Sequence, residues 1–119
     1  MQFMLMINED ESAYEGEAGA ALLEATLAGH MKLAEDLIAA GVPFSGERLK
    51  PAATATTIRW DNGAASLHDG PFAETHEELG GFYIIDVASL DAALEWAKRI
   101  PVPKGGIEVR PIWPMGAEG

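Results

Sequence analysis

The chain contains no cysteine and few cations: eight Lys and Arg residues stand against nineteen Asp and Glu residues, giving a net charge of −11. The missing thiols exclude disulfides and thiolate catalysis, and they agree with a reducing compartment. Because the negative charge repels nucleic acid and anionic lipid, we expect neither as a partner.

Long hydrophobic runs are also missing. No apolar segment reaches the roughly 20 residues that cross a bilayer. The first residues, MQFMLMINED, hold no Lys or Arg, and their apolar run is too short for a secretory signal. We therefore expect a cytoplasmic protein without membrane contact. The 119 residues suffice for one domain, although a domain this small is often helped by a partner subunit.

Hydrophobic periodicity predicts the first two elements. Residues 3–7 are a continuous apolar run, which is typical of a buried strand. From Ala18 to Ala40, apolar residues recur at steps of three and four, as on one face of a helix that Gly41 and Pro43 end. The residues assigned to this face are Leu23, Leu27, Met31, Ala34, Leu37 and Ile38.

Turn and capping signals predict the remaining elements. Asn62-Gly63 indicates a tight hairpin between two short β-branched or apolar segments. The other predicted elements are strands at 44–49, 53–60, 64–68, 82–87 and 107–112, and a helix that begins after Ser89 and ends before Pro101. This order predicts an α+β, ferredoxin-like fold, an antiparallel sheet with two main helices on one face.

His30 is the first candidate functional residue. It follows Leu27 by three positions and precedes Ala34 by four, so it lies on the apolar face of the first predicted helix. An imidazole there is either a core histidine bonded to a backbone carbonyl or a functional group that faces a cleft.

The segment HDGPFAETHEELGG, residues 68–81, carries a recognisable motif. Its run DGPFAET resembles the signature of the DGPF proteins, a branch of the YCII-related family. The upstream LKPAATATTIRWDNG and the downstream SLDAALEWAKRIP and IEVRPI are also similar to that family, so the resemblance covers nearly the whole chain. On this resemblance, residues 1–119 are a single YCII-related (DGPF) domain.

The resemblance implies a ferredoxin-like subunit of the dimeric α/β-barrel type, hence a homodimer, with an active site of one His and one Asp in a cleft. We assign the catalytic roles to His30 and Asp69. A carboxylate that orients the imidazole would let it act as general base or acid. Asp69 can equally serve only the Asp-Gly turn. The sequence departs from the family at His68 and His76, where Thr and Lys are usual.

Four further residues are candidate substrate-binding groups. In the loop, Glu74 and His76 would form a charged rim, and Phe72 would anchor the loop or stack on a ligand. Arg110, on the last predicted strand, would clamp a substrate carboxylate.

We predict no metal and no cofactor. His68, Asp69 and His76 could together hold a divalent ion, but no ligand spacing of a known metal motif supports this. The chain also lacks a phosphate loop, a dinucleotide fingerprint and a serine-nucleophile motif.

Two functions remain open at this point. The first is a lyase-, isomerase- or hydrolase-type enzyme that acts on a small molecule by proton transfer. The second, which the resemblance also implies, is a non-enzymatic binding or accessory module associated with an extracytoplasmic-function sigma factor.

Overall fold

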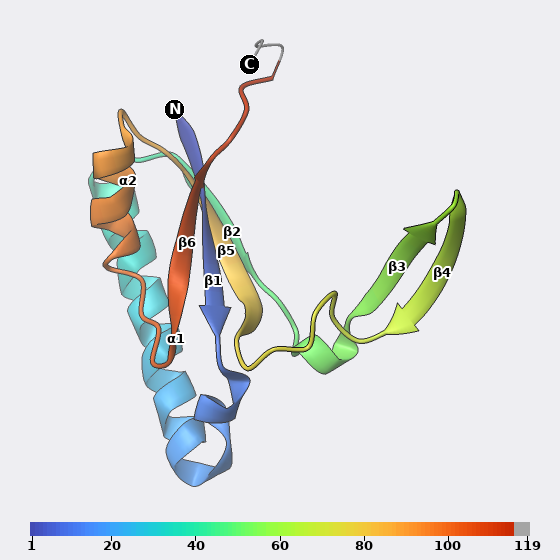
Figure 1. Ribbon diagram of the computed structural model, residues 1–119. Coiled ribbons are helices and arrows are strands. Elements are labelled where there is room, and N and C mark those ends of the chain that lie inside the picture. Colours follow the sequence, from blue (N-terminus) through green and yellow to red (C-terminus); the bar gives the residue numbers. More distant parts are fainter. Residues whose placement is uncertain (116–119) are drawn as a thin grey trace.

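The computed structural model describes residues 1–115. Its main sheet holds four antiparallel strands in the order β2-β5-β1-β6 (Figure 1). The bounds are β1 (Gln2–Glu9), β2 (Phe44–Arg48), β5 (Glu78–Asp86) and β6 (Gly105–Pro111). With the two helices, the core order is strand, helix, strand, strand, helix, strand, which is consistent with the predicted ferredoxin-like α+β plan.

Both helices cover the same face of this sheet (Figure 1). They are α1 (Gly16–Ala39) and α2 (Leu90–Ala97), which is N-capped by Ser89 as predicted. Alternation along β1 sends Phe3, Leu5 and Ile7 toward the helices, where all three are buried. The rest of the buried hydrophobic core comprises Leu33, Leu37, Ile85, Ala93, Ala97 and Ile100.

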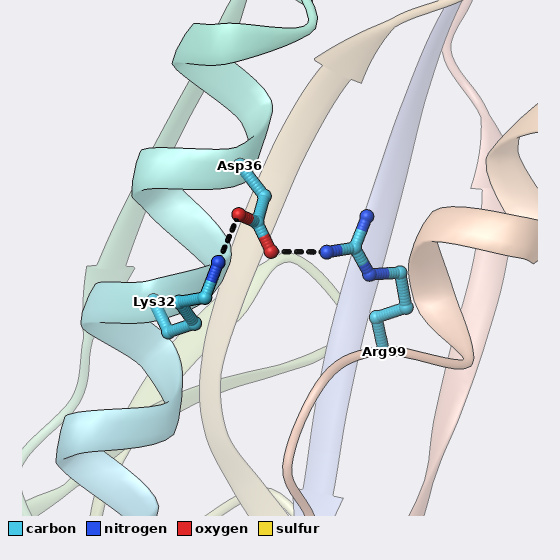
Figure 2. Close-up of polar contacts among 3 residues, drawn as sticks. All are labelled: Lys32, Asp36 and Arg99. Atoms are coloured by element: carbon cyan, nitrogen blue, oxygen red, sulfur yellow. Dashed lines mark hydrogen bonds and ion pairs between the residues drawn. The ribbon is translucent and has the colours of Figure 1, made fainter.

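An ion cluster joins α1 to the chain just beyond α2 (Figure 2). One carboxylate oxygen of Asp36 pairs with Lys32 one turn earlier, and the other pairs with Arg99. The hydrogen bond from Lys32, with the charge of Arg99, lowers the pKa of Asp36 below its ordinary value. The cluster therefore links α1 to the segment that follows α2 at the protein surface.

The hairpin stands apart from the main sheet. β3 (Thr56–Asp61) and β4 (Ala64–Asp69) form a separate two-stranded sheet that projects away from the helices (Figure 1). Asn62 and Gly63 both have positive φ, at 50° and 81°, as the Asn-Gly signal predicts. Two short 3-10 helices, η1 (Glu11–Tyr14) and η2 (Ala52–Thr54), complete the described elements. Within residues 1–115, no helix has the length and apolar character needed to cross a bilayer.

The predicted apolar face of α1 is partly wrong. Met31 and Ile38 are 70% and 69% exposed, whereas Leu33, which the periodic pattern left out, is buried. Because α1 is apolar over much of its circumference, apolar residues recur at steps of three and four on more than one face of the helix. The face that is buried in the structure is the one that carries Thr26, Leu33 and Leu37.

Replacing Leu37 by Ala is expected to cost about 2–5 kcal/mol of unfolding free energy, because the side chain is only 1% exposed and its removal leaves a cavity. Urea denaturation followed by circular dichroism measures the change. Ile38→Ala is the matched control on the adjacent, exposed position and should change stability by no more than about 0.5 kcal/mol. Equal losses for the two variants would contradict this packing.

Candidate functional site

A cavity of about 240 Å³ lies between α1 and the β2 side of the sheet. α1 contributes Leu23, Thr26, Leu27 and His30; β2 and β5 contribute the opposite wall. The residues that complete the lining are Ile7, Glu9, Tyr14, Phe44, Gly46, Glu47, Arg48, Gly81, Phe82 and Tyr83. Half of the lining residues are apolar or glycine, and half carry polar or charged groups, the carboxylates of Glu9 and Glu47 among them. Apolar walls with convergent polar groups are usual in small-molecule sites.

The cavity lies where two glycines, Gly46 and Gly81, leave the sheet without side chains. The pairings Gly46 with Tyr83 and Arg48 with Gly81 place both glycines on the face of the sheet that the helices cover. A Cβ on Gly81 would approach the Glu47 carbonyl oxygen to 2.8 Å, so glycine is also required for β2 to lie this close to β5. The pairing of β1 with β5 shifts at Ile7/Asn8, leaving Gly80 as the extra residue of a bulge beside the cavity.

His30 and Tyr83 form the central polar pair of the cavity. The Nδ1 atom of His30 lies 2.6 Å from the Tyr83 hydroxyl, and the two rings stack with 5.8 Å between their centroids. Among the described residues, Nε2 of His30 has no hydrogen-bond partner. The sequence hypothesis that His30 faces a cleft therefore describes its position better than a histidine bonded to a backbone carbonyl.

The surroundings keep both members of this pair neutral. Burial lowers the pKa of His30 below its ordinary 6.5, and the charge of Arg48 lowers it further. Burial also raises the pKa of the Tyr83 phenol above its ordinary 10.0. Near neutral pH, a neutral imidazole thus meets a protonated phenol. If Nδ1–H donates to the Tyr83 oxygen, the lone pair on Nε2 is available to a ligand as a base.

Arg48 supplies positive charge at the rim of the cavity. The side chain lines the hollow from the end of β2, and among the ion pairs of residues 1–115 none involves it. At the same end, the Tyr14 hydroxyl donates to Oε1 of Glu9 over 3.0 Å. A guanidinium without an acidic partner beside a neutral imidazole suits an anionic group on a ligand.

The single chain does not bring Asp69 to His30. Asp69 is the last residue of β4, is exposed, and does not line the cavity. Its cross-strand neighbour is Thr56, and it shares a face of the hairpin with Ile58 and Leu67. The ring nitrogen of His30 that was expected to donate to Asp69 is paired in this chain with the Tyr83 hydroxyl.

The other predicted site residues are dispersed. Glu74 and His76 line a second, shallower hollow near η1 and η2. Phe72 is 71% exposed; Arg59 donates to its carbonyl oxygen and places its guanidinium 4.3 Å from the ring centroid. Arg110 pairs with Glu108, and its register position opposite Met4 puts it on the sheet face away from the helices. Within residues 1–115, no His and acidic cluster of three or more has a metal-binding arrangement.

Tyr83, Tyr14 and Arg48 are among the cavity residues that sequence reasoning missed. Tyr83 lay inside a predicted strand, where aromatic residues normally serve packing. Arg48 lay in the predicted strand 44–49, and alternation there would have grouped it with Phe44 and Gly46. No local signal, however, says which face of that strand meets α1.

Comparison with known proteins agrees with the fold and leaves the chemistry open. Residues 1–116 match the YCII-related domain family. The chain is also similar to an uncharacterized protein of Rhizobium meliloti (strain 1021), with 48% identity over 68 residues. That alignment covers 55% of this chain and 55% of the relative, so the chain spans about half of the length of the protein that it matches.

Replacing Arg48 by Met should raise the pKa of His30 toward 6.5, because a nearby positive charge is removed while burial is kept. NMR titration of the imidazole signals measures this.

Since the folded pKa of His30 lies below 6.5, the neutral ring stabilises the fold fully above pH 6.5, and this contribution is lost as pH falls through the folded pKa.

Lys50→Met is the control, because Lys50 lies two residues further along the chain and does not line the cavity. It should leave the titration of His30 unchanged. An identical shift in both variants would show that general surface charge, rather than the cavity, sets the pKa.

Proposed function

The chain belongs to the YCII-related family, and we propose that its cavity binds a small, partly apolar molecule that carries a carboxylate or enolate oxygen. In the proposed reaction, a residue of the cavity removes a proton from this molecule. The observation that carries the proposal is the 2.6 Å contact between Nδ1 of His30 and the Tyr83 hydroxyl. Beside it lies the guanidinium of Arg48, which forms no ion pair within residues 1–115. The reaction is of the lyase or isomerase type, in which a base near neutral pH removes a proton beside an anionic group.

Each group has one role in this scheme. Arg48 pairs with the anionic oxygen of the ligand and stabilises the charge that develops on it. Nε2 of His30 accepts the proton, while Tyr83 fixes the orientation of the imidazole through Nδ1. Leu23, Leu27 and Phe44 cover the apolar part of the ligand and exclude water.

Asp69 is not required for this scheme within one chain. A role for it would require the hairpin of another copy to reach the cavity, because its own hairpin projects away from α1 (Figure 1). Glu74, His76 and Phe72 likewise contribute only if the loop of another copy, or a rearranged loop, approaches the ligand.

A panel of small aromatic and aliphatic carboxylic acids, titrated by NMR and calorimetry, tests the binding step. Arg48→Met is expected to weaken binding of a responsive acid at least about tenfold, because a charge-assisted bond is lost. Arg110→Met removes a cation of the same type outside the cavity and should leave affinity unchanged. Equal weakening by the two variants would favour nonspecific attraction over this site.

Turnover of a bound acid tests the chemical step. His30→Gln should lower kcat about 10²- to 10⁴-fold, the usual contribution of general acid–base catalysis, while binding persists. Tyr83→Phe should lower kcat less, because it only orients the imidazole. Full turnover by His30→Gln would exclude the mechanism. Binding with no turnover of any acid would favour the alternative function, a non-enzymatic binding module.

A further inference from the structure

The cavity carries a second polar pair, Glu9 and Tyr14, apart from His30. Glu9 is the last residue of β1, and the alternation of that strand places it on the helix side of the sheet with Leu5 and Ile7. Tyr14 ends η1 and donates its hydroxyl to Oε1 of Glu9 over 3.0 Å. Both side chains are partly buried and line the cavity, and the proposed function gives neither of them a role.

Two glycines allow this pair to lie where it does. A Cβ on Gly80, the extra residue of the β5 bulge, would overlap Oε2 of Glu9, so the carboxylate lies over the space that this missing side chain leaves. A Cβ on Gly19 would overlap the backbone of Tyr14, so glycine lets the first turn of α1 lie against η1. Backbone packing therefore holds the carboxylate at the cavity wall, together with the hydrogen bond from Tyr14.

One oxygen of the Glu9 carboxylate is left for a ligand. Oε1 accepts from Tyr14, whereas Oε2 has no hydrogen-bond or ion-pair partner among residues 1–115. Burial, and then the hydrogen bond to Glu9, raises the pKa of the Tyr14 phenol above its ordinary 10.0, so Tyr14 stays a donor near neutral pH. An ionised carboxylate only accepts hydrogen bonds, so a hydroxyl or an ammonium is the group that suits Oε2.

The other polar groups nearby do not compete for that role. Glu47 also borders the cavity, but its register opposite Phe82 puts its side chain on the sheet face away from the helices. The Thr26 hydroxyl already donates to the carbonyl oxygen of Leu22, one turn earlier in α1. Glu9 is thus the carboxylate on the helix side of the sheet in this cavity.

The groups that would meet a ligand lie at separate levels of the sheet. Along β5, the level of Tyr83 and His30 comes first, that of Arg48 next, and the bulge beneath Glu9 last. A strand rises about 3.3 Å per residue, so the first and last levels are roughly 10 Å apart. A ligand that reaches Glu9 as well as Arg48 therefore carries its hydrogen-bond donor and its anionic group at different ends of a short chain or ring.

We infer that Glu9, positioned by Tyr14, accepts a hydrogen bond from a second group on the ligand, a hydroxyl or an ammonium distant from the carboxylate that Arg48 binds. The substrate class is then a small hydroxy or amino carboxylic acid. A dicarboxylic acid is rejected, because its second carboxylate would meet the charge of Glu9. This inference rests on the proposed function, since it adds a second contact to the same ligand.

Hexanoate and its derivatives with a terminal hydroxyl, ammonium or carboxylate test this inference, because these acids share one flexible chain. NMR titration and calorimetry measure their binding. In the wild-type chain, the hydroxyl or the ammonium is expected to tighten binding relative to hexanoate at least about fivefold, and the second carboxylate to weaken it at least about fivefold. The derivative with the larger gain identifies the donor.

Glu9→Gln should bring both affinity ratios to within about twofold of unity, because the negative charge is lost while the shape is kept. Glu15→Gln is the control and should leave both ratios as in the wild type. Glu15 is exposed, lies next to Tyr14 in the chain, makes no side-chain cap to α1 and does not line the cavity. Tyr14→Phe should lower the gain part of the way, and it serves as the second variant if Glu9→Gln fails to fold.

The outcomes separate this inference from the proposed function. Equal binding of all these acids, weakened by Arg48→Met, would overturn the role of Glu9 and leave the proposed function standing. Equal changes in Glu9→Gln and Glu15→Gln, or an unchanged gain in Tyr14→Phe, would also overturn it. If none of the acids binds, or if Arg48→Met does not weaken binding, the proposed function fails and this inference fails with it.

Discussion

The register of β1 against its two neighbours is the constraint on which the rest of the structure depends. With Leu5 opposite Tyr83 and Ile7 opposite Gly81, one face of the sheet carries the core, the Tyr83 hydroxyl and the glycine gap of the cavity. A slip of one residue would exchange the two faces of β1 and bury Met4 and Met6 in place of the present core. The same pairing thus positions the candidate site.

The two faces of the sheet carry different physical roles. Under the helices, the absence of side chains at Gly46 and Gly81 leaves a hollow that α1 covers with His30. On the opposite face, β1 and β5 place Met4, Met6, Phe82 and Ile84 next to one another, and all four are partly buried.

The fold was more accessible to prediction than the site because its signals are local. The Asn62-Gly63 turn and the Ser89 cap both gave the correct elements, since backbone conformation there depends on neighbouring residues. The pairing of His30 with Tyr83 joins residues 53 positions apart, and no local pattern encodes it. Asp69 was assigned to the cavity from the motif, but the direction of the hairpin depends on tertiary contacts.

The most direct test of the account is a crystal structure of the chain with a bound small carboxylic acid. The account predicts the carboxylate at hydrogen-bonding distance from the Arg48 guanidinium, the apolar part of the acid between α1 and β2, and the His30–Tyr83 contact retained. An acid bound instead near Asp69, or in the hollow lined by Glu74 and His76, with the cavity beside α1 unoccupied, would contradict it.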